Sequence, residues 1–455
     1  MGLLRRQLWR WGNAVAGSRA WQCYQEFLRL GSGPPQTLCE LSSRRLERLL
    51  AHAVREVPYY RERCRGANRL EDFPILTKAE IRDHFFELMT PALAAAYPNP
   101  GNGYGWVAVQ TGGTSGMPTT VIHGPAFRDY GRAARAYSQF LCGFPPGTPY
   151  LRLWGSMKDI QQMQESFVQR AQRWINGETL LNAFRMDCDR MRRYLDVLSQ
   201  SPARHLMAYV DCAVELARFA RSTGIHVRPL ASIMACAGTV TEDVRRLLEE
   251  TFGGRVHNNY GSRDCSAMAC ECSEGGLHVY TNHVVLEVVD DEGAPLPAGA
   301  SGRILVTLLH NDEFPLIRYE IGDVGALATT PCRCGSAFPR LARVEGRVQE
   351  WIRTPAGTYL SPVYVRHLVG VVHNPGVVRR FQLVQETPAE FLLRLELEPG
   401  TDEESYRRVA ARLAEGLQAV LGPGCRLRVR RESRIEEEAS GKFLYVVRRQ
   451  EGLCA

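Results

Sequence analysis

The sequence contains almost no lysine. Only three of its 56 basic residues are lysine (Lys78, Lys158 and Lys442), so the other 53 are arginine. A coding bias toward arginine explains most of this imbalance. Under such a bias, a position that keeps lysine is a candidate for chemistry that needs a compact ammonium group, because the planar guanidinium of arginine does not replace it.

Strong net charge and long apolar runs are also missing. A net charge of +7 falls far short of a nucleic-acid-binding composition, so we expect no nucleic-acid partner. No run of 18 apolar residues occurs, so we expect no transmembrane segment. Residues 1–30 lack the apolar stretch of a secretory signal, and we expect a cytoplasmic protein. Those residues are rich in Trp and Arg, which fits either a helix packed on the body or contact with an anionic membrane surface.

The order of the predicted elements indicates an α/β fold. At about 100–200 residues per domain, 455 residues predict two to four domains. Residues 1–100 have helical periodicity, and strands alternate with helices after them. A capping box is predicted at Thr239–Glu242, at the start of a helix. Residues 391–429 predict strand, helix and strand, a small α+β unit that follows a boundary near residues 347–349.

A glycine-rich loop is the most informative segment. Residues 111–118 read Thr-Gly-Gly-Thr-Ser-Gly-Met-Pro. Glycines let backbone N–H groups approach an anion closely, and the hydroxyls add donors, so the loop suits phosphate. A Walker A loop is excluded because no Gly-Lys-Ser/Thr follows at the required spacing. A surface loop without a ligand remains the alternative for this segment taken alone.

Four further motifs follow the loop in order, and each is weak alone. They are Tyr260-Gly-Ser-Arg-Asp264, Arg318-Tyr-Glu-Ile-Gly-Asp323, Gly346-Arg-Val-Gln349 and Ser440-Gly-Lys442. The segments 57–61 and 73–78 precede them. In this order, the set resembles the adenylate-forming superfamily of acyl-CoA synthetases and adenylation domains. Within it, the chain most resembles the phenylacetate–CoA ligase and CapK-like branch, over nearly its whole length.

The resemblance implies an architecture and an activity. It implies an α/β protein with a large N-terminal adenylate-forming domain of mixed sheets and helices (residues 1–348), which binds ATP and the acid. A small mobile C-terminal α+β domain (residues 349–455) follows. The implied activity is ATP-dependent activation of a small carboxylic acid, expected to be aromatic, to an acyl-adenylate, and then transfer to coenzyme A.

Two alternatives to this activity remain open. The acyl group is transferred instead to a carrier-protein thiol or to an amine, or the chain is a nucleotide-binding scaffold without catalysis. Departures from the family pattern at Asp264, Thr239 and Gln349 keep the scaffold hypothesis open. The retained Lys442 argues against it.

The resemblance also assigns site residues. Lys442 matches the adenylation lysine, and Thr111 and Asp264 are the other catalytic candidates. Asp264 stands where the family usually has the Glu that binds Mg²⁺. Arg347 and Asp323 match ribose contacts, and Gln349 lies at the hinge. The residues at nucleotide-binding positions are Thr111, Gly112, Gly113, Thr114, Ser115, Gly116, Gly238, Thr239, Asn259, Tyr260, Gly261, Asp323, Arg347 and Gln349.

The cysteines suggest a zinc site. In a reducing compartment, clustered cysteines favour metal over disulfides. Cys272, His278, Cys332 and Cys334 supply three thiolates and one imidazole, a suitable tetrahedral Zn²⁺ set, and members of the resembled branch can carry zinc here. Cys270 is an alternative ligand, and simple buried cysteines are the alternative to a metal. Four protein ligands leave no place for a catalytic water, so the expected role is structural.

Overall fold

The computed structural model describes most of the chain. The described residues are 2–99, 105–111, 119–155, 167–183, 185–238, 240–345, 352–355, 359–360, 365, 368–369, 377–435 and 445–448.

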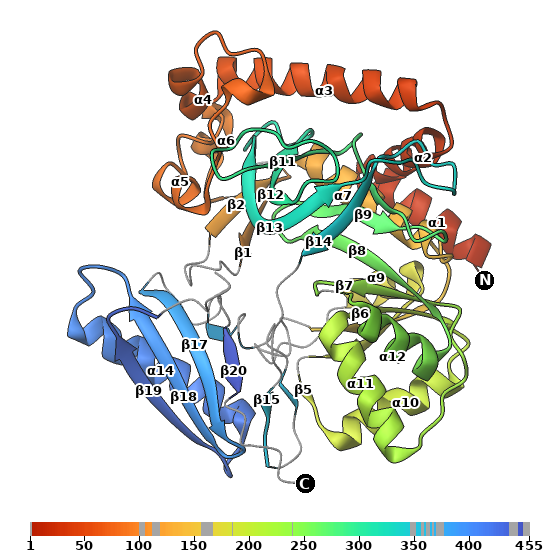
Figure 1. The fold of residues 1–455 in the computed structure, drawn as a ribbon, viewed down its shortest axis with the longest axis vertical. Coiled ribbons are helices and arrows are strands. Elements are labelled where there is room, and N and C mark those ends of the chain that lie inside the picture. The colour runs from red at the N-terminus through yellow and green to blue at the C-terminus, as the bar shows by residue number, and fades with distance from the viewer. Residues whose placement is uncertain are drawn as a thin grey trace.

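The first hundred residues form helices, as their periodicity predicts. These helices lie over the upper part of the molecule in Figure 1. Among the described residues, no helix combines the length and the apolar character needed to cross a bilayer. The helices are α1 (Gly2–Val15), α2 (Ala20–Gly31), α3 (Pro35–Glu56), α4 (Pro58–Arg63), α5 (Lys78–Asp83) and α6 (Pro91–Ala96).

An 11-stranded sheet forms the centre of the larger domain. Its strand order is β11-β12-β13-β14-β10-β9-β8-β7-β6-β3-β4. The strands are β3 (Tyr150–Trp154), β4 (Glu178–Asn182), β6 (His205–Tyr209), β7 (Ser232–Cys236), β8 (Arg255–Ser262), β9 (Ser266–Glu271), β10 (Leu277–Val279), β11 (Val284–Val289), β12 (Gly302–Leu308), β13 (Tyr319–Leu327) and β14 (Arg340–Glu345).

Strand direction changes at β8. The strands from β4 to β8 are parallel, whereas β8 pairs antiparallel with β9 and the remaining strands continue antiparallel. A separate antiparallel hairpin, β1 (Val107–Thr111) and β2 (Thr119–His123), carries residues 112–118 between its strands. The changeover at β8 matters because three predicted site residues lie on this strand.

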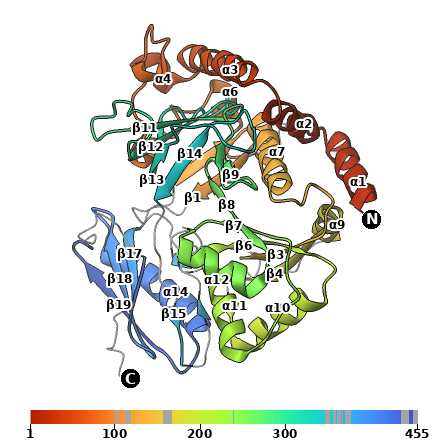
Figure 2. The same ribbon diagram turned by 45° about the vertical axis from the view of Figure 1, so that its right-hand side comes forward.

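Helices cover the faces of the parallel half. Side chains of β3, β6, β7 and β8 that point to one face pack on helices α10 (Cys188–Gln200), α11 (Val210–Thr223) and α12 (Glu242–Phe252). The other face packs on α2 and α7 (Pro125–Leu141). Figure 2 shows the first group of helices on the side of the sheet away from α7. A further helix, α9 (Phe167–Asn176), contacts α1.

The predicted capping box before α12 was in the wrong register. Thr241 is the N-cap, and its side chain accepts a hydrogen bond from the Val244 amide at 3.3 Å. Thr239 lies outside the described residues. The helix ends at Gly253 with a φ of +78°, a conformation that glycine adopts without a steric penalty.

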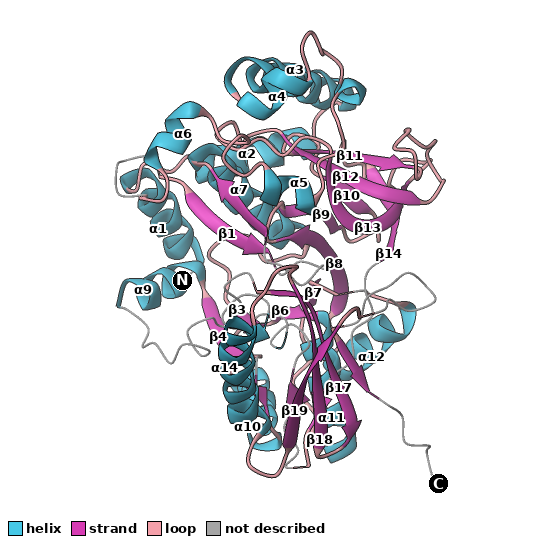
Figure 3. Ribbon diagram, turned by 90° about the vertical axis from the view of Figure 1, so that its left-hand side faces the viewer, coloured by secondary structure: helices cyan, strands magenta, loops and turns pink. Residues whose placement is uncertain are grey.

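The C-terminal part forms a small α+β unit, as predicted. Helix α14 (Glu403–Leu421) packs on a four-stranded sheet of order β19-β18-β17-β20. Its strands are β17 (Val378–Thr387), β18 (Glu390–Leu397), β19 (Arg426–Glu432) and β20 (Val446–Arg448). A three-stranded sheet joins β15 (Ile352–Arg353) and β16 (Tyr359–Leu360) to β5 (Arg185–Met186) of the larger domain. Figure 3 shows α14 and its sheet beside the parallel half of the central sheet.

Two histidines are stacked in the core of the larger domain. The His310 ring lies 3.4 Å from that of Tyr130, and the His283 ring stacks on Phe127 at 5.2 Å. Burial lowers the pKa of His310 to about 3 and that of His283 well below its usual value. Both therefore remain neutral in the folded protein near neutral pH.

We predict that acid destabilises the fold through these histidines. The unfolded chain binds protons below about pH 6.5, whereas folded His310 does not do so until about pH 3. Stability is thus complete above pH 6.5 and falls as the pH drops, by about 1.4 kcal/mol per pH unit for each such histidine. Urea unfolding followed by tryptophan fluorescence between pH 7.5 and 5 measures this slope. His310→Gln keeps a donor for the Asn282 carbonyl and should reduce the slope, and an unchanged slope would contradict the assignment.

Candidate functional site

Two tyrosine–aspartate hydrogen bonds join β8 to β13. Tyr260 on β8 donates to Oδ2 of Asp323 on β13 at 3.0 Å. In the opposite sense, Tyr319 on β13 donates to Oδ2 of Asp264, just after β8, at 2.5 Å. The two strands are four positions apart in the sheet, so the sheet must curl to bring them together. The motifs at 260–264 and 318–323 therefore meet in space.

The surroundings keep Tyr260 protonated as a donor. Burial, and then the charge of Asp323, raises the pKa of Tyr260 well above its usual value. Asp264 is buried, with 4% of its surface exposed, whereas Asp323 is half-buried. Of the two carboxylates, Asp323 is thus the more accessible to a ligand.

The hairpin that carries the glycine-rich loop is attached to Asp264. His123, at the end of β2, lies with Nε2 at 2.9 Å from the Asp264 carbonyl oxygen. Burial lowers the pKa of His123, so the ring is neutral and donates this bond. At the other end of β2, Arg82 donates to the Thr119 hydroxyl at 3.1 Å. Thr111 pairs with Thr119 across the hairpin, so residues 112–118 connect the two strands at the end opposite His123 and its contact with Asp264.

The loop after β7 lies next to β8. Cys236, the last residue of β7, pairs in register with Asn259, whose side chain donates to Cys236 Sγ at 3.7 Å. Ala237 has a φ of +55°, and a Cβ on Gly238 would lie 2.7 Å from Cβ of Val210. Glycine is therefore required at 238, and the loop packs directly on the start of α11.

Lys78 is a site residue to which the sequence assigned no task. It opens α5, and its Nζ donates to the Ile321 carbonyl oxygen at 3.3 Å, two residues before Asp323. The scarcity of lysine makes Lys78 a candidate functional residue. Its place in the fold is defined only by the contact between α5 and β13. The ammonium group therefore lies against β13, two residues along the strand from Asp323.

Several predicted residues lie outside the described part of the chain. They are Gly112, Gly113, Thr114, Ser115, Gly116, Thr239, Arg347, Gln349 and Lys442. Their roles remain predictions. Among the described members of the predicted set, Tyr260 contacts Asp323, Asp264 follows β8, and Asn259 pairs with the end of β7, whereas Thr111 lies in the separate hairpin. Gly261 is so close to β9 that a Cβ would lie 2.3 Å from the Ser266 carbonyl oxygen.

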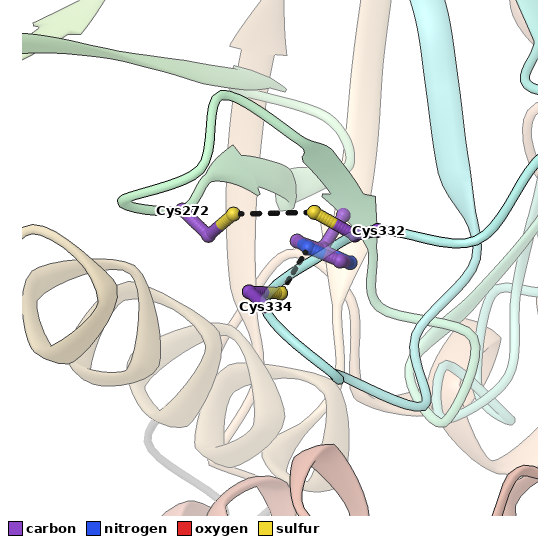
Figure 4. A group of neighbouring side chains, drawn as sticks. Cys272, Cys332 and Cys334 are labelled. Carbon is purple, nitrogen blue, oxygen red and sulfur yellow. Dashed lines mark hydrogen bonds between the residues drawn. The ribbon is translucent and has the colours of Figure 1, made fainter.

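The predicted zinc ligands form a compact cluster. One ligand atom from each of Cys272, His278, Cys332 and Cys334 lies within 4.8 Å of all the others. Figure 4 shows the three sulfurs and the imidazole pointing toward a common centre. The turn after β9 supplies Cys272 and the adjacent β10 supplies His278, while the turn between β13 and β14 supplies the other two thiols.

The dimensions of the cluster suit tetrahedral zinc. With Zn–S bonds of about 2.3 Å, tetrahedral geometry puts two sulfurs about 3.8 Å apart. The Cys272 and Cys332 sulfurs are 3.7 Å apart, and His278 Nε2 lies 3.1 Å from the Cys334 sulfur. His278 Nδ1 is 2.8 Å from the Phe338 carbonyl oxygen, which fixes the tautomer that leaves Nε2 for a metal. Cys270, the alternative ligand, instead lies 3.7 Å from the Cys142 sulfur.

A cavity lies on the side of α5 next to β2. Its volume is about 510 Å³, and Asp264 and Asp323 do not line it. The lining residues are Arg82, Asp83, His84, Phe85, Phe86, Glu87, Tyr97 and Thr120. The cavity therefore does not belong to the site built around the aspartates.

Comparison with known proteins gives the relationships of the chain. Residues 352–449 match the family model of the CapK C-terminal domain. The phenylacetate-coenzyme A ligase of Thermus thermophilus is 25% identical over 81% of this chain and 86% of that protein. Protein CapK of Staphylococcus aureus is 22% identical over 79% of this chain and 78% of that protein. The resemblance predicted from the motifs is thereby confirmed.

The fold is similar to that of another CoA ligase of known structure. A crystal structure of 2-hydroxyisobutyryl-CoA ligase in complex with 2-HIB-AMP and CoA covers 92% of this chain and 92% of its own, with a TM-score of 0.58 and 19% identity. A second structure of that ligase has a TM-score of 0.53. The α/β architecture with a C-terminal α+β unit is thus confirmed. The chain is a homologue of phenylacetate–CoA ligases and CapK, and its fold is similar to that of 2-hydroxyisobutyryl-CoA ligase.

Proposed function

We propose that the protein activates a carboxylic acid with ATP, forms an acyl-adenylate and transfers the acyl group to coenzyme A. The observation that carries this proposal is the meeting of Asp264 and Asp323 beside the hairpin of the glycine-rich loop, in a homologue of phenylacetate–CoA ligases. These enzymes need a nucleotide, an anionic phosphate chain and a carboxylate held close together. The site contains separate groups for each of these tasks.

The nucleotide is held between β7 and β13 in this proposal. Asp323 accepts hydrogen bonds from the ribose hydroxyls, and Tyr260 holds its carboxylate in place. The loop at Gly238 flanks the base, while residues 111–116 and Lys78 contact the phosphates. A boundary near residue 348 lets residues 349–455 reorient between the two half-reactions, with Gln349 as the hinge and Arg347 beside the ribose.

Charge neutralisation is the main catalytic requirement. The acid carboxylate attacks the α-phosphorus, the bond to the bridging oxygen breaks, and pyrophosphate leaves. The Lys442 ammonium bridges the carboxylate and phosphate oxygens as negative charge spreads over the transferring group. Asp264 suits Mg²⁺, since a carboxylate can accept from Tyr319 and still ligate a metal. Bound Mg²⁺ supplies charge neutralisation on the phosphates.

The proposal also includes the acceptor of the acyl group and the cellular location. The thiol of coenzyme A attacks the acyl carbon, and AMP leaves with its electron pair on the phosphate oxygen. The proposed location is the cytoplasm, where ATP and coenzyme A are available. Transfer to a carrier-protein thiol or an amine is the second candidate reaction, and a non-catalytic scaffold is the third.

The experiment that tests the activity uses a panel of aromatic and aliphatic acids. The protein is incubated with ATP, Mg²⁺ and each acid, and pyrophosphate is measured. Adding coenzyme A and detecting the thioester by mass identifies the acceptor. Pyrophosphate release with at least one acid, followed by a thioester, supports the proposal. Pyrophosphate without a thioester favours another acceptor, and tight ATP binding without pyrophosphate favours the scaffold.

We predict that Lys442→Ala reduces pyrophosphate release by about 100-fold or more, because the transferring charge loses its ammonium partner. ATP affinity, measured by calorimetry, should change little. Lys442→Arg is the matched variant, and we expect it to recover little activity, since a guanidinium fork does not reproduce a compact point charge. Normal adenylation by either variant would contradict the assigned role.

We predict that Asp323→Ala weakens ATP binding about tenfold or more, the cost of a charge-assisted hydrogen bond. Tyr260→Phe keeps the carboxylate but removes its donor and should have a smaller effect. Asp243→Ala is the control, because Asp243 lies on the exposed surface of α12. Calorimetric titration with ATP measures all three, and equal affinity in Asp323→Ala and Asp243→Ala would exclude a ribose contact.

We also propose that the four-residue Cys/His cluster binds a structural zinc ion. Its support is the fit of the sulfur spacing and of the His278 tautomer to tetrahedral coordination. A Cβ at Gly276 would lie 2.6 Å from the Cys332 sulfur, so the turn after β9 is built closely around the cluster. Bound zinc supplies a cross-link between this turn and the turn that precedes β14.

We predict that purified protein holds one zinc ion per chain after dialysis against a weak chelator. Cys332→Ser should lose the metal and unfold at a lower temperature. The control is Cys39→Ser, because Cys39 is exposed and far from the cluster in the sequence. Elemental analysis and thermal unfolding measure both effects. Zinc-free protein with the stability of the wild type would argue for simple thiols.

A further inference from the structure

Helix α1 presents an apolar stripe to solvent. None of its residues is buried, and Leu3, Leu4, Trp11 and Val15 have 79%, 55%, 67% and 87% of their surface exposed. At 3.6 residues per turn, these four positions fall within one side of the helix. Such a stripe is far larger than the scattered exposed apolar residues of an ordinary surface.

The opposite side of α1 holds the helix on the protein. The Trp9 ring lies 5.8 Å from that of Trp21, and the Arg5 guanidinium lies 5.2 Å from the ring of Trp174 on α9. At Gly147, a Cβ would lie 2.7 Å from the Gly2 carbonyl oxygen, so α1 packs closely on this turn. The helix is therefore docked by one face, and its apolar stripe faces outward.

Helices α1 and α9 carry arginines but no acidic residue. Helices α1 and α9 contact each other and contain five arginines but no Asp or Glu. The first acidic residue of the chain is Glu26, which forms a bidentate pair with Arg45. The five arginines are Arg5, Arg6 and Arg10 on α1, and Arg170 and Arg173 on α9.

The positive charge of this surface indicates what kind of partner binds the apolar stripe. A two-fold dimer through this face would place two copies of the same arginine-rich surface together, which is unfavourable. An anionic bilayer surface instead offers phosphates to the arginines and an apolar boundary to Leu and Trp side chains. Tryptophan also favours the membrane–water interface.

We propose that the surface formed by α1 and α9 docks the protein peripherally on bilayers that contain anionic phospholipids. In Figures 1 and 2, α1 lies on the opposite side of the molecule from α14 and its sheet. Docking therefore leaves the C-terminal unit away from the membrane. The inference is independent of the proposed ligase activity.

Vesicle sedimentation of the full chain tests the proposal. One set of vesicles is pure phosphatidylcholine, and the other contains about 30% phosphatidylglycerol, which supplies the anionic surface. We expect about tenfold stronger binding to the anionic vesicles, and weaker binding at high salt, because the arginines contribute electrostatically.

The variant Leu4→Glu/Trp11→Glu should lose this binding. Both positions are exposed, so the variant should keep the thermal unfolding midpoint of the wild type. Phe86→Glu is the matched control, because Phe86 is 61% exposed and follows α5, on the other side of the molecule. It should bind vesicles like the wild type.

Three outcomes would overturn the proposal. The first is the absence of binding to anionic vesicles. The second is equal binding by wild type and Leu4→Glu/Trp11→Glu. The third is a concentration-dependent dimer, seen by light scattering, that this variant abolishes while vesicles do not bind, since the face would then be an interface between copies.

Discussion

The reciprocal hydrogen bonds between two tyrosines and two aspartates are the constraint on which the site depends. Tyr260 and Asp264 come from one end of β8, and Tyr319 and Asp323 come from β13. Each segment supplies one donor and one acceptor, so two strands that are not neighbours in the sheet are linked at two points. Both tyrosines are buried, so their hydrogen bonds are shielded from water, and burial raises the pKa of Tyr260 well above its usual value. The curl of the sheet and the position of both carboxylates follow from this arrangement.

The two carboxylates of the site belong to the central sheet, whereas its proposed cations belong to other parts of the chain. Asp264 and Asp323 belong to the central sheet, but Lys78 reaches it from α5. Lys442 belongs to the C-terminal unit, in the segment outside the described residues. This division suits the proposed reaction, in which phosphate and carboxylate charges must be neutralised only when the substrates are bound. In a chain that uses arginine almost everywhere, the proposed reaction gives a task to two of the three lysines, Lys78 and Lys442.

Much of the fold could be predicted from local patterns, and the contacts within the site could not. Helical periodicity identified the first hundred residues, and strand–helix–strand alternation identified the C-terminal unit. The capping box failed because Thr239 and Thr241 are both possible caps, and only the backbone geometry selects Thr241. The order of the motifs indicated the site, but its contacts depend on sheet curvature, which no local pattern encodes.

The members of the cysteine cluster likewise could not be fully predicted from the sequence. Spacing nominated Cys272, His278, Cys332 and Cys334, with Cys270 as a rival ligand. Alternation along the strand did not decide between them, and the contact between Cys270 and Cys142 did. The apolar stripe of α1 is a similar case, because the composition of residues 1–30 favoured packing on the body but left membrane contact open. In the structure, one face of α1 packs on the protein and the other is exposed to solvent.

In the proposed reaction, the acid carboxylate attacks the α-phosphorus of ATP. The most direct test supplies an acid that the protein accepts with ¹⁸O in its carboxylate, together with ATP and coenzyme A, and measures the mass of the released nucleotide. An acyl-adenylate keeps a carboxylate oxygen on its phosphorus when the thiol displaces AMP. We therefore predict AMP that carries one ¹⁸O atom. Unlabelled AMP, or ADP with labelled phosphate, would contradict it.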